Sequence, residues 1–205
     1  MFRLAVNGGM SGRRQFGLVA ALLGLLVFPG PAGAATPLQF TDLQGVRREP
    51  LEFKSQKAVV FFFLLQDCPI CNAYSAEIGR IIEKYSPQNV DFYAVQIDPD
   101  LSPDEARRHA RDFAIKCPVL LDRRHELVRA AKAVVTPEAA VFIPGGRLVY
   151  RGRIDDTFLD FGKRRESASV HDLRAALDAV LDGRPVEHPV TQAVGCYIST
   201  KNEGK

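Results

Sequence analysis

Two cysteines separated by two residues stand where a predicted strand runs into a predicted helix. Cys68 and Cys71 follow the apolar run 59–65 and precede the helical pattern 72–85. Free backbone N–H groups and the dipole at a helix N-terminus favour a thiolate over a thiol at the first sulfur. Such a thiolate can attack a disulfide and is then released by the second thiol. The pair predicts a redox site with Cys68 as nucleophile and Cys71 as resolving cysteine.

Structural interpretations of this pair compete with the redox one. A structural zinc site usually takes four ligands in closely spaced pairs, whereas Cys117 and Cys196 each stand alone. Covalent haem attachment needs a histidine directly after the second cysteine, where this chain has Asn72. A structural disulfide is the remaining alternative, and the strand-to-helix position argues against it because that position creates thiol reactivity. We therefore expect no metal and no cofactor beyond the dithiol.

The first 34 residues have the pattern of a secretory signal peptide. A basic start with Arg3, Arg13 and Arg14 leads into the short apolar stretch 16–28, and a small-residue cleavage site at 32–34 follows. The paired arginines also resemble a twin-arginine export signal. We expect cleavage before Ala35, no membrane span afterwards, and a periplasmic or otherwise extracytoplasmic protein. Disulfides persist in that compartment.

Charge gives no sign of a nucleic-acid partner. The chain has 27 basic and 24 acidic residues. Three of the basic residues and none of the acidic ones lie in the predicted leader, so the remaining chain has a formal net charge of zero. Its length suits one domain with a substantial core. We expect a domain over residues 35–185 and a tail over 186–205 that carries Cys196.

The rest of the chain alternates strand-like and helix-like segments. The run 57–65 is apolar throughout, as expected of a central strand covered on both faces. Ser102 and Pro103 predict the start of a helix that ends near Phe113. The alternation predicts an α/β fold with a central mixed β-sheet flanked by helices. The further predicted strands are 90–97, 118–121, 139–143 and 148–153, the further helices are 72–85, 125–133 and 170–181, and residues 38–53 are predicted as a lead-in strand or hairpin.

With Thr136-Pro137 before a late hairpin, the chain resembles thioredoxin-fold proteins. In that family the proline is cis and lies against the cysteine pair, where it shapes a groove for an extended peptide. The resemblance implies that Thr136 and Pro137 frame a substrate groove beside Cys68 and Cys71. It also implies a disulfide-containing client protein and a second protein that recycles the dithiol.

A closer resemblance is to secreted redoxin-domain proteins, in the branch that contains peroxiredoxins and extracytoplasmic thiol–disulfide reductases. In those relatives a tail cysteine like Cys196 recurs and the second active-site cysteine can be replaced. The resemblance therefore leaves open whether Cys71 or Cys196 resolves Cys68. The matching segments are 67–74, 151–156, 160–163 and 194–198.

Two positions depart from the thioredoxin pattern. Phe62 occupies the place of a buried acid that serves as proton acceptor, and Asp67 replaces the aromatic residue that usually precedes the motif. The negative charge of Asp67 is expected to oppose thiolate formation at Cys68. No positively charged residue stands between the two cysteines. Cys117 is expected to be a small buried residue or to pair with Cys196, which sequence does not settle.

Two other functions compete with disulfide exchange. A peroxiredoxin-like peroxide reductase would need Thr or Ser three residues before the reactive cysteine, where Leu65 stands and cannot donate a hydrogen bond. A thioredoxin-fold copper chaperone, which is not an enzyme, would bind Cu(I) through two thiolates and a distant histidine. The candidate histidines are His109, His125, His171 and His188.

Overall fold

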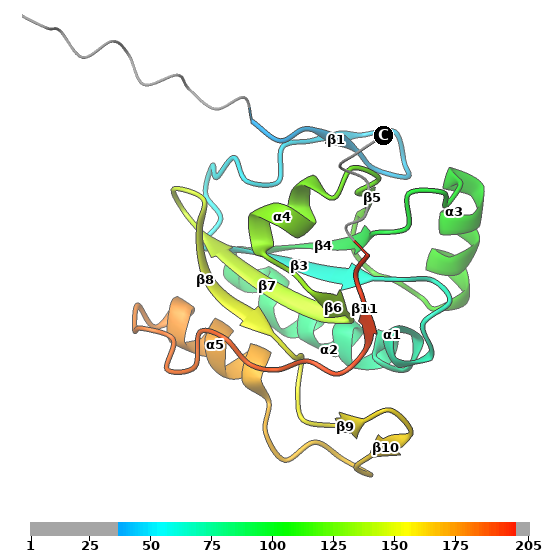
Figure 1. Ribbon diagram of the computed structural model, residues 1–205. Helices are drawn as coiled ribbons and strands as arrows, with labels where there is room; N and C mark the ends of the chain where they lie inside the picture. The colour runs from blue at the N-terminus through cyan, green and yellow to red at the C-terminus, as the bar shows by residue number, and fades with distance from the viewer. Residues whose placement is uncertain (1–36, 200–205) are drawn as a thin grey trace, which may run out of the picture. The chain divides into compact units, whose positions relative to one another are not determined.

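A five-stranded mixed sheet forms the centre of the fold (Figure 1). The computed structural model describes residues 37–199, so the leader predicted for residues 1–34 lies outside the described residues. The strand order is β5-β4-β3-β7-β8, with β3 parallel to β4 and antiparallel to β7. The predicted α/β class with a mixed sheet is confirmed. The five strands are β3 (Ala58–Leu64), β4 (Val90–Gln96), β5 (Val119–Leu121), β7 (Glu138–Ile143) and β8 (Arg147–Gly152).

Helices cover both faces of this sheet. One apolar cluster contains Phe62 together with residues of α2 and α5, and the other contains Phe61 and Phe63 together with residues of α4. Successive side chains of a strand point to opposite faces, so an uninterrupted apolar run suits a strand that is buried on both sides. The helices are α1 (Pro69–Ala73), α2 (Ser75–Tyr85), α3 (Pro103–Asp112), α4 (Glu126–Ala131) and α5 (Asp172–Leu181), with a short 3-10 helix at Ser86–Gln88.

Local sequence signals explain where two of these helices begin. Ser102 caps α3 in a capping box, because its side chain accepts a hydrogen bond from the Glu105 N–H while the Glu105 carboxylate accepts one from the Ser102 N–H. The helix predicted for residues 72–85 instead begins at Pro69 and is interrupted at Tyr74. Proline is favoured at the first helical position, and here it makes the second cysteine part of α1.

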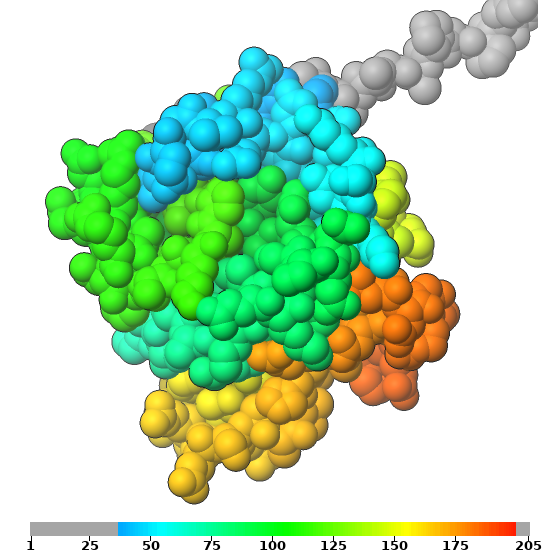
Figure 2. Space-filling model, turned by 180° about the vertical axis from the view of Figure 1, so that it is seen from behind, coloured from blue at the N-terminus to red at the C-terminus, as the bar shows by residue number. Residues whose placement is uncertain are grey.

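Short strands outside the central sheet complete the fold. The hairpin expected within residues 38–53 is present as β1 (Phe40–Thr41) and β2 (Arg47–Arg48). The hairpin of β9 (Phe158–Asp160) and β10 (Lys163–Arg164), which projects at the lower edge of the face in Figure 2, was not predicted from sequence. Neither was the pairing of β6 (Val135–Thr136) with β11 (Cys196–Tyr197) in the tail. No helix in the described part of the chain is long and apolar enough to cross a bilayer.

Candidate active site

Cys68 lies at the N-cap of α1, directly after the turn that leaves β3. Its backbone N–H donates to the Leu65 carbonyl at 3.1 Å, which closes that turn, and Pro69 occupies the first helical turn. Cys71 follows within α1, and both side chains are buried. The strand, the turn and the helix start therefore place both sulfurs of the motif at the end of the sheet.

The Thr136-Pro137 segment meets this motif from a distant part of the chain. The peptide bond between these residues is cis, as the thioredoxin resemblance implied. The Cys68 sulfur lies 3.6 Å from the Thr136 carbonyl oxygen. Thr136 is fully buried, so β6 presents its backbone rather than its side chain at this point.

The tail supplies a third sulfur. β11 pairs antiparallel with β6, and Cys196 stands opposite Thr136 in the register. The Cys196 Sγ lies 3.4 Å from the Cys68 Sγ, well beyond the ~2.05 Å of a disulfide bond, so no disulfide joins them in this structure. Figure 1 shows β11 between β6 and α1. The structure thus brings Cys196 to Cys68 and not into the pair with Cys117 considered above, and Cys117 is a free thiol too.

The pKa of the Cys68 thiol is lowered to about 5. A hydrogen bond from the Cys71 side chain is the largest cause, and the backbone N–H groups at the start of α1 and the Cys196 thiol add to it, while burial opposes them. The pKa of Cys68 falls although the neighbouring Asp67 was expected to oppose thiolate formation. A cysteine with this pKa is ionised at neutral pH, and the thiolate is the form that attacks a disulfide.

The other three cysteines have raised pKa values. Burial, followed by the neighbouring Cys68 thiolate, raises the pKa of Cys71 far above its ordinary range. The same two causes raise the pKa of Cys196, and burial raises the pKa of Cys117 to about 12. Part of the shift at Cys71 and Cys196 comes from the Cys68 charge. It disappears when Cys68 enters a disulfide, so either thiol ionises more readily at the moment when it would be needed.

Comparison with known proteins agrees with this geometry. A protein-family model described as Redoxin matches residues 31–161, a segment that contains Cys68, Cys71, Thr136 and Pro137 but ends before the tail. The chain belongs to the Redoxin family. A comparison with curated proteins gave no match.

Solved structures share the fold of this redoxin. An uncharacterized conserved protein from Geobacillus kaustophilus is 31% identical with a TM-score of 0.68, covering 83% of this chain and 92% of that one. A hypothetical protein from Sinorhizobium meliloti 1021 is 25% identical with a TM-score of 0.69, covering 83% and 93%. A secreted Mycobacterium tuberculosis disulfide oxidoreductase homologous to Escherichia coli DsbE is 14% identical with a TM-score of 0.50, covering 70% and 96%. At 14% identity the last similarity concerns the fold alone.

A series of hydrogen bonds between polar residues, which begins at Asn72 next to the cysteine motif, was not predicted from sequence. His109 of α3 contacts Asn72 Oδ1 through Nε2 at 2.8 Å and Gln96 Nε2 through Nδ1 at 3.1 Å. Asn72 donates in turn to the Gln66 carbonyl at 2.9 Å. Burial lowers the pKa of His109, so the ring is neutral at neutral pH. These hydrogen bonds connect residues 66–72 to α3 and β4. From sequence, Asn72 was noted as the residue that excludes haem and as part of the matching segment 67–74, but not as a partner of His109.

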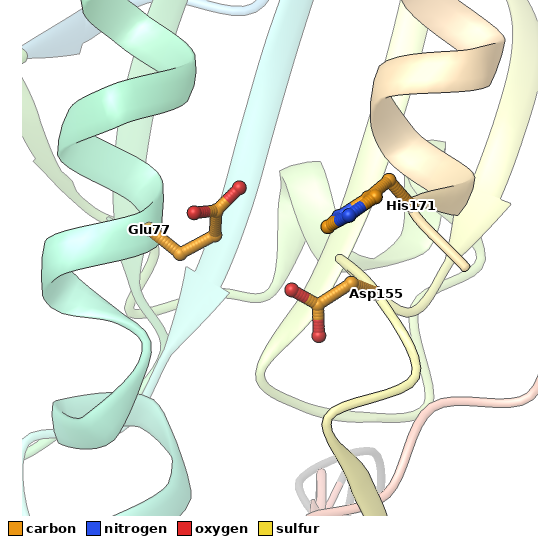
Figure 3. Close-up of side chains that lie close together, drawn as sticks. All are labelled: Glu77, Asp155 and His171. Carbon is orange, nitrogen blue, oxygen red and sulfur yellow. The ribbon is translucent and has the colours of Figure 1, made fainter. Parts of the chain in front are cut away.

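Three residues away from the sulfurs have the composition of a metal site. Glu77, Asp155 and His171 each offer a ligand atom within 4.8 Å of the others and point toward one another (Figure 3). Yet Glu77 Oε1 accepts from Arg174 at 2.6 and 2.8 Å, and Asp155 Oδ1 accepts from the Tyr74 hydroxyl at 2.8 Å. Because these oxygens have partners and a guanidinium stands beside them, we interpret the cluster as a link between α2, α5 and the loop after β8.

The copper interpretation lacks support from ligand geometry. Among residues 37–199, neither Cys68 nor Cys71 belongs to a group of three possible ligands with atoms within 4.8 Å of one another. His109 is occupied by Asn72 and Gln96, and His125 contacts the Ile97 carbonyl at 2.8 Å. A Cu(I) site with two thiolates and a histidine would need a rearrangement of the described residues.

Proposed function

We propose that this redoxin is an extracytoplasmic thiol–disulfide oxidoreductase that acts on protein disulfides through Cys68. The observation that carries the proposal is one thiolate with two neighbouring thiols, placed against the backbone of a cis-proline loop. Because its pKa is lowered, Cys68 is the thiolate that acts as nucleophile. Because their pKa values are raised, Cys71 and Cys196 stay protonated until one of them resolves the mixed disulfide. The reaction needs no cofactor beyond these thiols.

The first step forms a mixed disulfide. The Cys68 thiolate attacks one sulfur of the client disulfide, the client S–S bond breaks, and the other client sulfur leaves as a thiolate that takes a proton from solvent. Thr136 and Pro137 frame the groove in which the client segment lies. The Thr136 carbonyl, 3.6 Å from the Cys68 sulfur, is positioned to align the client backbone beside it.

The second step releases the client. Cys71 or Cys196 loses its proton and attacks the Cys68 sulfur, the bond to the client breaks, and the second client sulfur leaves with a proton. The client gains two electrons and the redoxin keeps an internal disulfide. A second redox protein then restores the dithiol. The same steps in reverse oxidise a client, so the direction follows from the reduction potentials.

The location follows from the predicted leader. We propose that residues 1–34 direct export and are removed, that residues 35–185 form the redoxin domain, and that residues 186–205 form a tail with Cys196. An oxidising compartment outside the cytoplasm holds disulfide-bearing clients in quantity.

An assay with three substrates tests the function. The reduced protein is incubated with insulin and a recycling thiol, with hydrogen peroxide, and with a Cu(I) donor. We expect insulin disulfides to be reduced faster than by the recycling thiol alone, because Cys68 is ionised at pH 7. Rapid peroxide consumption without insulin reduction would instead establish the peroxidase alternative. Stoichiometric Cu(I) retention without turnover would establish the chaperone.

A further inference from the structure

The tail follows the edge of the fold from β8 to the active site. Thr191 is its firm anchor, because its N–H donates to the Arg151 carbonyl at 3.0 Å and its hydroxyl contacts the Tyr150 hydroxyl at 2.7 Å. At the other end β11 pairs with β6, and beyond this pairing the Ile198 N–H donates to the Val134 carbonyl at 2.9 Å. Between these two points the tail runs past Cys68.

The part of the tail beside Cys68 is held by a two-residue pairing and by the partly buried side chains of Val194, Cys196 and Ile198. β11 is two residues long, and Tyr197 is 85% exposed, so its large side chain adds almost no buried surface. Segments with few buried apolar contacts and few backbone hydrogen bonds open at low free-energy cost. β11 can therefore leave β6 while the anchor at Thr191 stays in place.

The backbone of this part of the tail nevertheless lies very close to the backbone of β6. A Cβ atom built at Gly195 would overlap the Thr136 carbonyl, with only 2.6 Å to its carbon atom. Only glycine lets the tail backbone come this near to β6. This close approach places Cys196 opposite Thr136, with the Cys196 sulfur 3.4 Å from the Cys68 sulfur. With the tail in this position Cys68 is only 1% exposed, although in the proposed function its sulfur must meet a client.

We propose that residues 194–198 occupy the docking edge of β6 as an internal substitute for the client, and that a client strand must displace them to bring its own cysteine to the place of Cys196. The partner that fits is an extended, cysteine-bearing segment that pairs with the β6 backbone, since an added strand gains its affinity from main-chain hydrogen bonds. This inference rests on the proposed function. The seated tail lowers the apparent affinity for the client by the fraction of molecules in which the edge is free.

Variants that unseat the tail test this proposal. All are made in the full chain carrying Cys196→Ser, so that capture of Cys68 by the tail thiol does not enter the readout. Gly195→Val introduces the overlap with Thr136, and Ile198→Pro removes the N–H that donates to Val134. Tyr197→Ala is the matched control, because that side chain is exposed and its change leaves the backbone pairing intact. The probe is an extended synthetic peptide with one mixed disulfide to a fluorescent thiol, and the readout is the rate of release in a single turnover.

The expected result is a release rate at least about 10-fold higher in both unseating variants, with Tyr197→Ala within about twofold of the parent. Equal rates in all four proteins would overturn the inference and leave the proposed function standing. If no variant reacts with the peptide although iodoacetamide modifies Cys68, the proposed function fails and this inference fails with it. Two chemically different unseating variants keep the test valid if one of them does not fold.

Discussion

Replacement of Cys68 by serine is expected to lower the rate of insulin reduction about 1000-fold, to the level of the recycling thiol alone. Cys68 is the one cysteine among the described residues whose pKa falls, to about 5. A hydroxyl at the same place is not ionised at neutral pH and forms no disulfide. The steady-state rate of insulin reduction in purified variants measures the effect.

Cys117→Ser is the matched control for that substitution. Burial raises the pKa of Cys117 to about 12, so this thiol stays protonated and takes no part in exchange. The control is expected to reduce insulin within about twofold of the unaltered protein. A Cys68→Ser protein that retains full activity, or a Cys117→Ser protein that loses it, would contradict the assignment of the nucleophile.

The second large effect concerns the resolving thiols. The protein with both Cys71→Ser and Cys196→Ser is expected to accumulate the mixed disulfide with its client and to turn over at least about 100-fold more slowly. Each single variant is expected to release the client, because Cys68 has two neighbours: Cys71 donates a hydrogen bond to it, and the Cys196 sulfur lies 3.4 Å away. Non-reducing gel electrophoresis and mass spectrometry of the trapped complex measure the outcome.

The single variants decide how the two thiols divide this step. Retention of the complex by Cys71→Ser alone would show that Cys196 does not resolve it. Retention by Cys196→Ser alone would show the same of Cys71. In the expected outcome, Cys71→Ser yields a Cys68–Cys196 disulfide and Cys196→Ser yields a Cys68–Cys71 disulfide, which peptide mapping distinguishes.

Much of the fold follows from local sequence. The apolar run of β3, the helix start at Ser102 and the hairpin of the predicted strands 139–143 and 148–153 each depend on a few neighbouring residues, and the structure has the elements that they predict. The start of α1 was misplaced by three residues because the helical pattern becomes amphipathic only after Asn72, whereas Pro69 already has the backbone of a first turn.

The site was only partly predictable because its remaining contacts are long-range. β11 spans two residues, too few for an alternating pattern, and it exists only because β6 lies beside it. The same holds for the contact between Cys196 and Cys68, which are 128 positions apart. His109 has no local feature that marks it as a partner of Asn72. Gly195 is the one local clue, since a glycine directly before a cysteine permits a close backbone approach.

The pH dependence of Cys68 alkylation tests the central claim most directly. The reduced protein is treated with iodoacetamide from pH 4 to pH 10, and peptide mapping follows carbamidomethylation of each cysteine. Only the thiolate reacts, so the rate at Cys68 is expected to rise through a midpoint near pH 5 and then to stay level to pH 8. A seated tail slows the reaction at every pH without moving this midpoint. A midpoint near 9, the ordinary value for a cysteine, would contradict the account, because Cys68 would then be a thiol at neutral pH.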